Sequence, residues 1–178
     1  MRIISGLHKG RKINAPKNLP IRPTTDMAKE ALFNILNNSY YFDEISVLDL
    51  FAGSGNISYE FASRGCEQIL AVEIHSGCVD FIEKTNTALD MPIRTVKSDV
   101  FTFLQKTDQS FDIIFADPPY ALSVEEFEQI AQIIFDKKLL KDGGVLVIEH
   151  EKHMDLTKAP FFKEARKYGS SVFGFFEK

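Results

Sequence analysis

Cysteine and long apolar runs are both scarce in this sequence of 178 residues. The two cysteines, Cys66 and Cys78, are too few for a disulfide framework and match no zinc-binding pattern. No apolar run approaches the ~20 residues that cross a bilayer, and the first residues lack the apolar core of a signal peptide. We therefore expect a protein of the reduced cytoplasm with no membrane partner.

Acidic residues are absent from the first 25 positions, although the whole chain has a net charge of −4. That segment carries a net charge of +6, and the remainder carries −10. A basic segment on an acidic body is the distribution expected where one part of a protein meets phosphates. The alternative is a solvated hairpin whose charge is incidental. We predict that residues 1–22 form a basic arm, with a return strand at 12–15, whose phosphate contacts are Arg2, Lys9, Arg11, Lys12 and Arg22.

Residues 23–178 show strand-like and helix-like segments in alternation, at a length that fits one domain. The segment 26–37 is expected to be a helix capped by Thr24, Thr25 or Asp26. After it, strands are expected at 47–50, 69–73, 93–96, 111–116 and 145–148, with helices from about 57 and at 76–89, 100–106 and 124–137. Two antiparallel strands, 161–168 and 171–176, are expected to close the chain. This pattern predicts an α/β fold with a doubly wound, mostly parallel seven-stranded sheet of the Rossmann-like type.

The tetrapeptide Asp117 to Tyr120 follows the apolar strand 111–116. Its two consecutive prolines cannot donate ladder hydrogen bonds, so the strand must end there. The result is an acidic side chain, free carbonyls and an aromatic ring at the carboxyl end of a strand, where open α/β sheets bind ligands. Such a group suits a planar base with an exocyclic amine, because the ring can stack while Asp117 and the Pro118 carbonyl accept the N–H bonds. The alternative is a strand-ending turn with a surface tyrosine.

A cofactor site is indicated by the loop between the strand 47–50 and the helix that follows it. Gly53 and Gly55 allow a ligand to approach the backbone closely, and Glu73 ends the next strand, where it can bind ribose hydroxyls. The dinucleotide fingerprint is incomplete, because Ser58 stands where its third glycine belongs. Asp49 is unfavourable beside a pyrophosphate but favourable beside a cation.

A further acidic residue ends the third strand. Asp99 and the N–H of Val100 could read an adenine edge, although Asp99 could equally cap the next helix. Acids at three successive strand ends fit a cationic nucleoside, S-adenosylmethionine.

The segments Asp49–Gly55 and Asp117–Tyr120 together resemble amino-group methyltransferases of the class I S-adenosylmethionine-dependent fold. Three further stretches, 1–11, 22–36 and 63–65, are similar to the RsmD family of bacterial 16S rRNA (guanine-N2)-methyltransferases. The resemblance covers essentially the whole chain. It implies 16S rRNA as the partner, within a small-subunit particle or an assembly intermediate.

The resemblance also implies roles for individual residues. The amine of guanine would be held by Asp117 and Pro118, with Tyr120 stacked on the base. Gly53 and Gly55 would line the methionine moiety of the cofactor, Glu73 would bind the ribose, and Asp99 and Val100 would bind the adenine. The 22–26 block, which contains Thr25, would help to close over the cofactor. Asp49 and Phe51 complete the set of predicted cofactor-binding residues. The chain departs from the family at Met27, where arginine is common, and at Asn56 and His75. The first departure weakens any expectation of an RNA contact at Met27.

Other functions remain possible from the sequence. An adenine-N6 methyltransferase uses a similar tetrapeptide, but this chain has no room for a separate target-recognition domain. A nicotinamide oxidoreductase lacks support without the third glycine, and a non-catalytic RNA-binding module would have no use for the intact Asp117–Tyr120 set. His150 and His153 with their acidic neighbours lie at and beyond a strand end in a charged loop, so we expect no metal.

Overall fold

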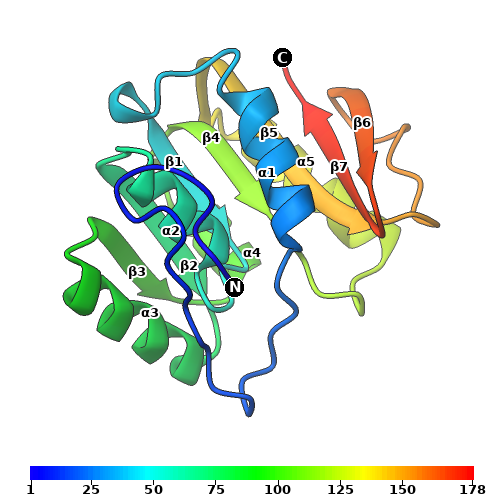
Figure 1. Ribbon diagram of the computed structural model, residues 1–178. Coiled ribbons are helices and arrows are strands. Elements are labelled where there is room, and N and C mark those ends of the chain that lie inside the picture. Colours follow the sequence, from blue (N-terminus) through cyan, green and yellow to red (C-terminus); the bar gives the residue numbers. More distant parts are fainter.

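The computed structural model describes residues 1–178 as one seven-stranded sheet with helices packed on both faces (Figure 1). The helices are α1 (Asp26–Leu36), α2 (Asn56–Ser63), α3 (Ser76–Leu89), α4 (Val100–Lys106) and α5 (Val124–Asp136), with one 3-10 turn, η1 (Phe42–Glu44). The strands are β1 (Ser46–Leu50), β2 (Gln68–Glu73), β3 (Ile93–Lys97), β4 (Phe111–Ala116), β5 (Leu140–Glu151), β6 (Phe162–Tyr168) and β7 (Ser171–Phe176). No helix is both long enough and apolar enough to cross a membrane.

The strand order is β3-β2-β1-β4-β5-β7-β6. The first five strands are parallel, and β7 is antiparallel to both of its neighbours, β5 and β6. The predicted doubly wound, mostly parallel seven-stranded sheet is therefore confirmed. The chain reverses its direction of winding between β1 and β4, so the loops after these two strands diverge. A crevice at such a point is where open α/β sheets bind ligands.

Two apolar cores lie on opposite faces of the sheet. Alternate strand residues face opposite sides, so Val47 packs in one core with α1, α2 and α3, whereas Leu48 packs in the other with α4 and α5. Figure 1 shows α1 in front of the sheet, with the N-terminal arm crossing in front of α2. Because both faces are covered, β1 is buried along its full length.

Two expectations about strands need correction. The fifth strand begins at Leu140 rather than at 145, because a register shift opposite Phe111 and a positive φ of 76° at Gly143 let the pairing continue past the glycines. The predicted return strand of the arm is absent, and only a single bridge joins Arg2 to Lys12.

The N-terminal arm is docked on α2 through a buried carboxylate. The backbone N–H groups of Ile4 and Ser5 donate to Glu60 at 2.9 and 3.0 Å. Glu60 also accepts from Arg64 Nε at 2.9 Å and pairs with Lys29 Nζ at 3.4 Å. The arm, α1 and α2 are thus tied together by one fully buried group.

Candidate active site

The Asp117–Tyr120 segment leaves the sheet at the carboxyl end of β4. The Asp117 N–H still donates to the Leu50 carbonyl of β1, at 3.4 Å, and the next two residues are the prolines that end the ladder. The Leu122 N–H then donates to the Pro119 carbonyl at 3.1 Å and closes a turn. This turn leaves the Tyr120 side chain outside the core, with 54% of the residue exposed.

Asp117 lies among charged groups of both signs. Burial raises the pKa of the Asp117 carboxyl well above its usual range, and repulsion by Glu149 adds to the rise. Arg22 acts in the opposite direction, with its Nη2 3.4 Å from Asp117 Oδ1. The guanidinium carbon of Arg22 also lies 3.3 Å from the centroid of the Tyr120 ring.

The loop after β1 holds a left-handed backbone at three positions. Phe51 has φ 58°, Gly53 has φ 56° and Gly55 has φ 87°. A Cβ on Gly55 would lie 2.8 Å from the Tyr59 ring, so glycine is required there for space as well as for conformation. Glu73 holds the loop, since its carboxylate accepts from the N–H of Gly53 at 2.7 Å and from that of His75 at 2.9 Å.

Asp49 is a buried carboxyl with one hydrogen-bond partner. Its residue is 1% exposed, and the Ser58 hydroxyl donates to Oδ2 at 2.6 Å. Burial raises the pKa of Asp49 to about 7; the Ser58 hydrogen bond opposes the rise and repulsion by Glu73 adds to it. No lysine, arginine or histidine side chain forms an ion pair with Asp49.

A cavity of about 560 Å³ connects the loop after β1 with the Asp117–Tyr120 turn. Its volume suits a nucleoside-sized ligand. Seven of the residues named from the sequence as cofactor or catalytic residues line it, together with Arg22: Asp49, Phe51, Gly53, Glu73, Asp117, Pro118 and Tyr120.

Other predicted cofactor residues lie outside the lining of this cavity. Asp99 caps α4 by accepting from the Thr102 N–H at 2.9 Å, and Val100 is buried behind it. Thr25 caps α1 by accepting from the Ala28 N–H at 3.2 Å, and Gly55 is the residue before α2. Cofactor contacts at these four positions stay predictions.

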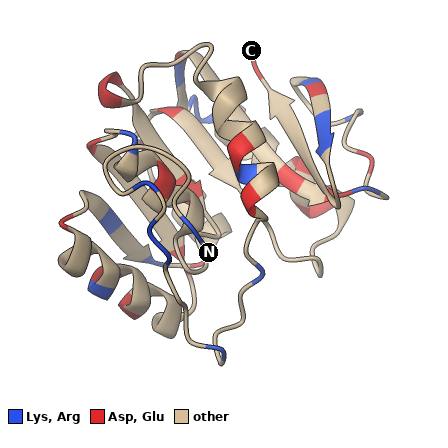
Figure 2. Ribbon diagram, viewed as in Figure 1, with Lys and Arg blue, Asp and Glu red and all other residues tan.

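Figure 2 shows that the basic positions of the arm are spread along its length. Arg22 is the one predicted phosphate contact that lines the cavity. Lys9, Arg11 and Lys12 are exposed, whereas Arg2 pairs with Asp26 at 3.3 Å. Their RNA contacts likewise stay predictions.

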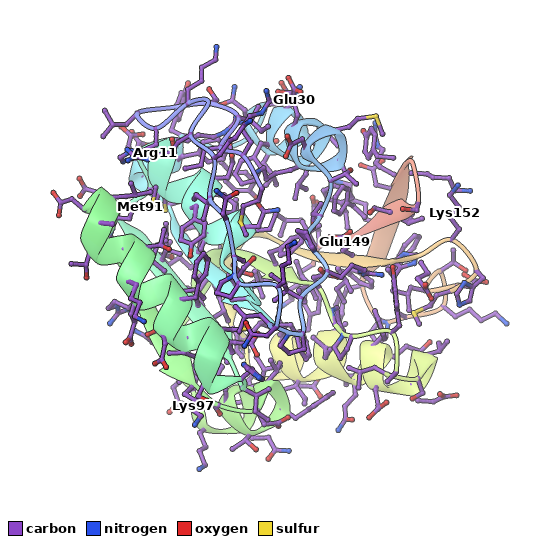
Figure 3. All side chains as sticks on the ribbon, turned by 60° about the horizontal axis from the view of Figure 1, so that its bottom comes forward. Arg11, Glu30, Met91, Lys97, Glu149 and Lys152 are labelled. Atoms are coloured by element: carbon purple, nitrogen blue, oxygen red, sulfur yellow. The ribbon has the colours of Figure 1, made fainter.

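Three buried polar side chains make contacts that the sequence did not indicate. Thr24 and Asn56 line the cavity, and Glu149 is hydrogen-bonded to Thr24. Glu149 accepts from Thr24 Oγ1 and from Ser171 Oγ, both at 2.7 Å. Figure 3 shows Glu149 in the interior and Arg11 at the periphery. Asn56 accepts from Lys29 Nζ at 2.8 Å and donates to the Thr24 carbonyl at 3.2 Å, which gives a structural reason for this departure from the family pattern. Of the three, only Glu149 has a sequence context that could have signalled its role, because it directly follows the apolar run 145–148.

No cluster of three or more histidine, cysteine, aspartate or glutamate side chains is arranged to hold a metal ion. His153 Nε2 lies 3.2 Å from a carboxylate oxygen of Glu151, and His150 Nδ1 lies 2.9 Å from the Glu151 carbonyl. The two rings therefore take part in local contacts at the end of β5.

The sheet and its helices define the class I S-adenosylmethionine-dependent methyltransferase fold. A hypothetical protein of Thermus thermophilus has a solved structure with a TM-score of 0.86 and 28% identity, covering 100% of this chain and 99% of that one. The T. thermophilus 16S rRNA N2 G1207 methyltransferase RsmC, solved with AdoMet and guanosine, has a TM-score of 0.68 at 23% identity and covers 90% of this chain and 45% of that one. The second likeness establishes the fold alone.

The family model described as conserved hypothetical protein 95 matches residues 1–177. Ribosomal RNA small subunit methyltransferase D of Buchnera aphidicola (Acyrthosiphon pisum) is 34% identical over 157 residues, 86% of this chain and 80% of that protein. The Escherichia coli K12 protein of the same name is 30% identical over 161 residues, 90% of this chain and 79% of its own length. The chain belongs to the RsmD family.

Proposed function

We propose that this protein transfers the methyl group of S-adenosylmethionine to the exocyclic N2 amine of a guanine in 16S rRNA. The observation that carries the proposal is one cavity shared by two sets of groups: Asp49, Gly53 and Glu73 at one part, and Asp117, Pro118 and Tyr120 at another. The family relatives named ribosomal RNA small subunit methyltransferase D support the rRNA substrate. The choice of guanine as the target base goes beyond what the names of these relatives state.

The residues around the β1 loop fit S-adenosylmethionine. When bound, the cofactor supplies a methyl group on a positively charged sulfur. Asp49 is the buried carboxyl that lacks a counter-charge, Gly53 leaves room for close approach, and Glu73 keeps free lone pairs for ribose hydroxyls. This set favours a cationic nucleoside over a pyrophosphate.

The Asp117–Tyr120 turn acts on the nucleophile. The N2 lone pair of guanine is conjugated with the ring and attacks poorly. Acceptance of its two hydrogens by Asp117 and the Pro118 carbonyl favours a pyramidal nitrogen, whose lone pair then points at the methyl group. Positioning and electrostatics supply most of the rate, and the acidic cation formed on transfer loses its proton readily.

The substrate base must leave its stack to reach the cavity, at a cost of a few kcal/mol. Tyr120, which is more than half exposed at the cavity mouth, offers a ring on which the base can stack. The exposed basic side chains of the arm contact the flanking phosphates, and the rRNA is presented within a small-subunit particle or an assembly intermediate.

The proposal is tested by incubating the protein with methyl-labelled S-adenosylmethionine and three substrates in parallel: unmodified small-subunit particles, naked rRNA and duplex DNA. The nucleic acid is digested and the labelled nucleoside identified. N2-methylguanosine from rRNA is the expected product. N6-methyladenine would keep the mechanism and refute the substrate, whereas cofactor binding without any labelled product would favour an RNA-binding module.

The role of Asp117 is tested by Asp117→Ala. We expect a loss of at least roughly a hundredfold in the single-turnover rate, because the amine loses one of its two acceptors. Binding of S-adenosylhomocysteine, measured by calorimetry, should stay within about twofold. Turnover near the wild-type rate would contradict the assignment.

The role of the arm is tested by Arg11→Glu, measured as RNA affinity over a range of salt concentrations. One lost phosphate contact lowers the slope of log affinity against log salt by about 1. Lys106→Glu, a change of the same charge near the end of α4, is the control that should leave the slope unchanged. Equal slopes for Arg11→Glu and wild type would refute the phosphate contact.

A further inference from the structure

Arg22 has two simultaneous contacts with the residues proposed to bind the target base. Its guanidinium carbon lies 3.3 Å from the centroid of the Tyr120 ring, and its Nη2 lies 3.4 Å from Asp117 Oδ1. The side chain lines the same cavity as these two residues. It therefore lies where a base would have to lie to stack on this side of Tyr120 and donate to Asp117.

The chemistry of the two occupants is alike. A guanidinium is a planar carbon bonded to three nitrogens, and it stacks on aromatic rings while its N–H groups donate to carboxylates. The N1, C2, N2 and N3 atoms of guanine form the same planar unit, with N–H donors on N1 and N2. Arg22 thus presents to Tyr120 and Asp117 the part of guanine that carries the reacting amine.

The position of Arg22 is fixed by neighbours on both sides of it in the chain. Thr24 donates through its hydroxyl to buried Glu149 at 2.7 Å, and its carbonyl accepts from Asn56 at 3.2 Å. On the other side, the Ile21 N–H donates to the Leu19 carbonyl at 2.9 Å. The Ile21 side chain also lies close to the loop after β1, since its Cγ2 would be 3.6 Å from a Cβ added to Gly53. The backbone is held, so displacement of Arg22 needs only a rotation of its side chain.

The contacts of Arg22 are also weak enough to be displaced. Its side chain is 42% exposed, and ion pairs and cation–π contacts at such sites contribute little each. Asp117 gains a neutralising partner while no base is present, which offsets the repulsion from Glu149.

We propose that Arg22 is an internal substitute for the target base: it occupies the base position in the RNA-free protein and competes with the base for Tyr120 and Asp117. A base enters only if it replaces both the stack and the donors, which favours one with an amine at its edge. This inference rests on the proposed function and adds to it a residue that controls access. Once displaced, Arg22 is free to meet a phosphate.

The competition is tested with nucleosides, which contain no phosphate. Guanosine and adenosine are titrated, in the presence of saturating S-adenosylhomocysteine, into the wild type, Arg22→Ala and Arg22→Lys. The control Lys17→Ala removes the same charge from an exposed position of the same arm. Loss of the competitor should tighten guanosine binding roughly three- to tenfold in both Arg22 variants, since lysine keeps the charge but not the planar group. Lys17→Ala should bind guanosine as the wild type does.

A second measurement reports the contact itself. With carbon-13 in the tyrosine rings, the Tyr120 signals, assigned with Tyr120→Phe, should shift in Arg22→Ala and keep their position in Lys17→Ala. Unchanged Tyr120 signals in Arg22→Ala would overturn the proposal.

Three binding results also decide the matter. Equal guanosine affinity in wild type and Arg22→Ala would overturn the competition and leave the guanine proposal standing. Tighter binding of adenosine alone in the variants would support the competition and refute guanine. Failure of both nucleosides to bind Arg22→Ala would overturn the competition as well.

Discussion

Two buried carboxyl groups, Glu60 and Asp49, lie in opposite circumstances. Glu60 is 0% exposed and is surrounded by donors: two backbone N–H groups, the Arg64 guanidinium and the Lys29 ammonium. Asp49 is 1% exposed, accepts one hydroxyl and has no cation beside it. A saturated buried charge holds structure together, whereas an unsaturated one represents a cost that a ligand can relieve.

The comparison predicts a large loss of stability when Glu60 is neutralised. Glu60→Gln leaves the Lys29 ammonium buried without its charge partner and turns amide donors toward other donors, so the free energy of unfolding should fall by about 3–5 kcal/mol. Chemical denaturation measures this fall. Glu30→Gln, an exposed position on α1, is the control and should change stability by less than about 0.5 kcal/mol. If Glu60→Gln lowered the free energy of unfolding by no more than Glu30→Gln does, the contacts of Glu60 with the arm, Lys29 and Arg64 would be dispensable for stability.

Neutralising Asp49 is expected to raise the stability of the protein rather than lower it, by an amount that depends on pH. The folded pKa of about 7 lies above the unfolded value near 3.9, so the folded state binds the extra proton between these limits. The stabilisation from this proton is therefore complete below about pH 4 and is lost as the pH rises to about 7. Above that pH the free energy of unfolding levels off, after a total fall of up to about 4 kcal/mol.

Asp49→Asn should remove this part of the pH dependence and stabilise the cofactor-free protein at pH 8. The measurement is the unfolding midpoint of wild type and variant at pH 5 and pH 8. If both proteins lost the same stability between these pH values, the burial cost at Asp49 would be absent.

Two glycines of the arm allow a smaller effect to be measured: the part of the stability that comes from docking of the arm on α2, as distinct from the conformation of its turn. Gly6 and Gly10 both have positive φ, 87° and 81°, but a Cβ on Gly6 would overlap the Ser63 carbonyl, whereas one on Gly10 meets nothing within 4 Å. Gly10→Ala should cost about 1 kcal/mol for the left-handed backbone alone, and Gly6→Ala about 3 kcal/mol. Thermal unfolding gives both values. Equal losses would mean that the arm is not held on α2.

The centre of the sheet was predictable because strands such as Val47 to Leu50 and Phe111 to Ala116 are mainly apolar runs bounded by turn residues. The start of β5 was not predictable from this signal. Lys141, Asp142 and the two glycines are polar or flexible. They extend the strand only because Leu140 and Val145, on either side of them, both pair with β4.

The chemistry of the candidate site was predictable from the sequence, but not every residue that lines it was. Asp49, Glu73 and Asp117 were identified from strand ends, and all three line one cavity. Arg22 is predicted from its charge to contact phosphate, and the resemblance places it in the 22–26 block expected to close over the cofactor. Its contact with Tyr120 joins residues nearly 100 positions apart, and no local pattern reports such a contact.

The sequence by itself determined the order of strands and helices, the glycine loop and the motif that ends β4, because these depend on local periodicity and backbone restriction. The tertiary structure decided which charges are neutralised. Arg64, four residues after Glu60, is a partner that the sequence spacing can indicate. The packing of the arm and α1 adds Lys29 and two N–H groups around Glu60 and places no cation beside Asp49. Electrostatic state follows from neighbours in space, and those neighbours come from distant parts of the chain.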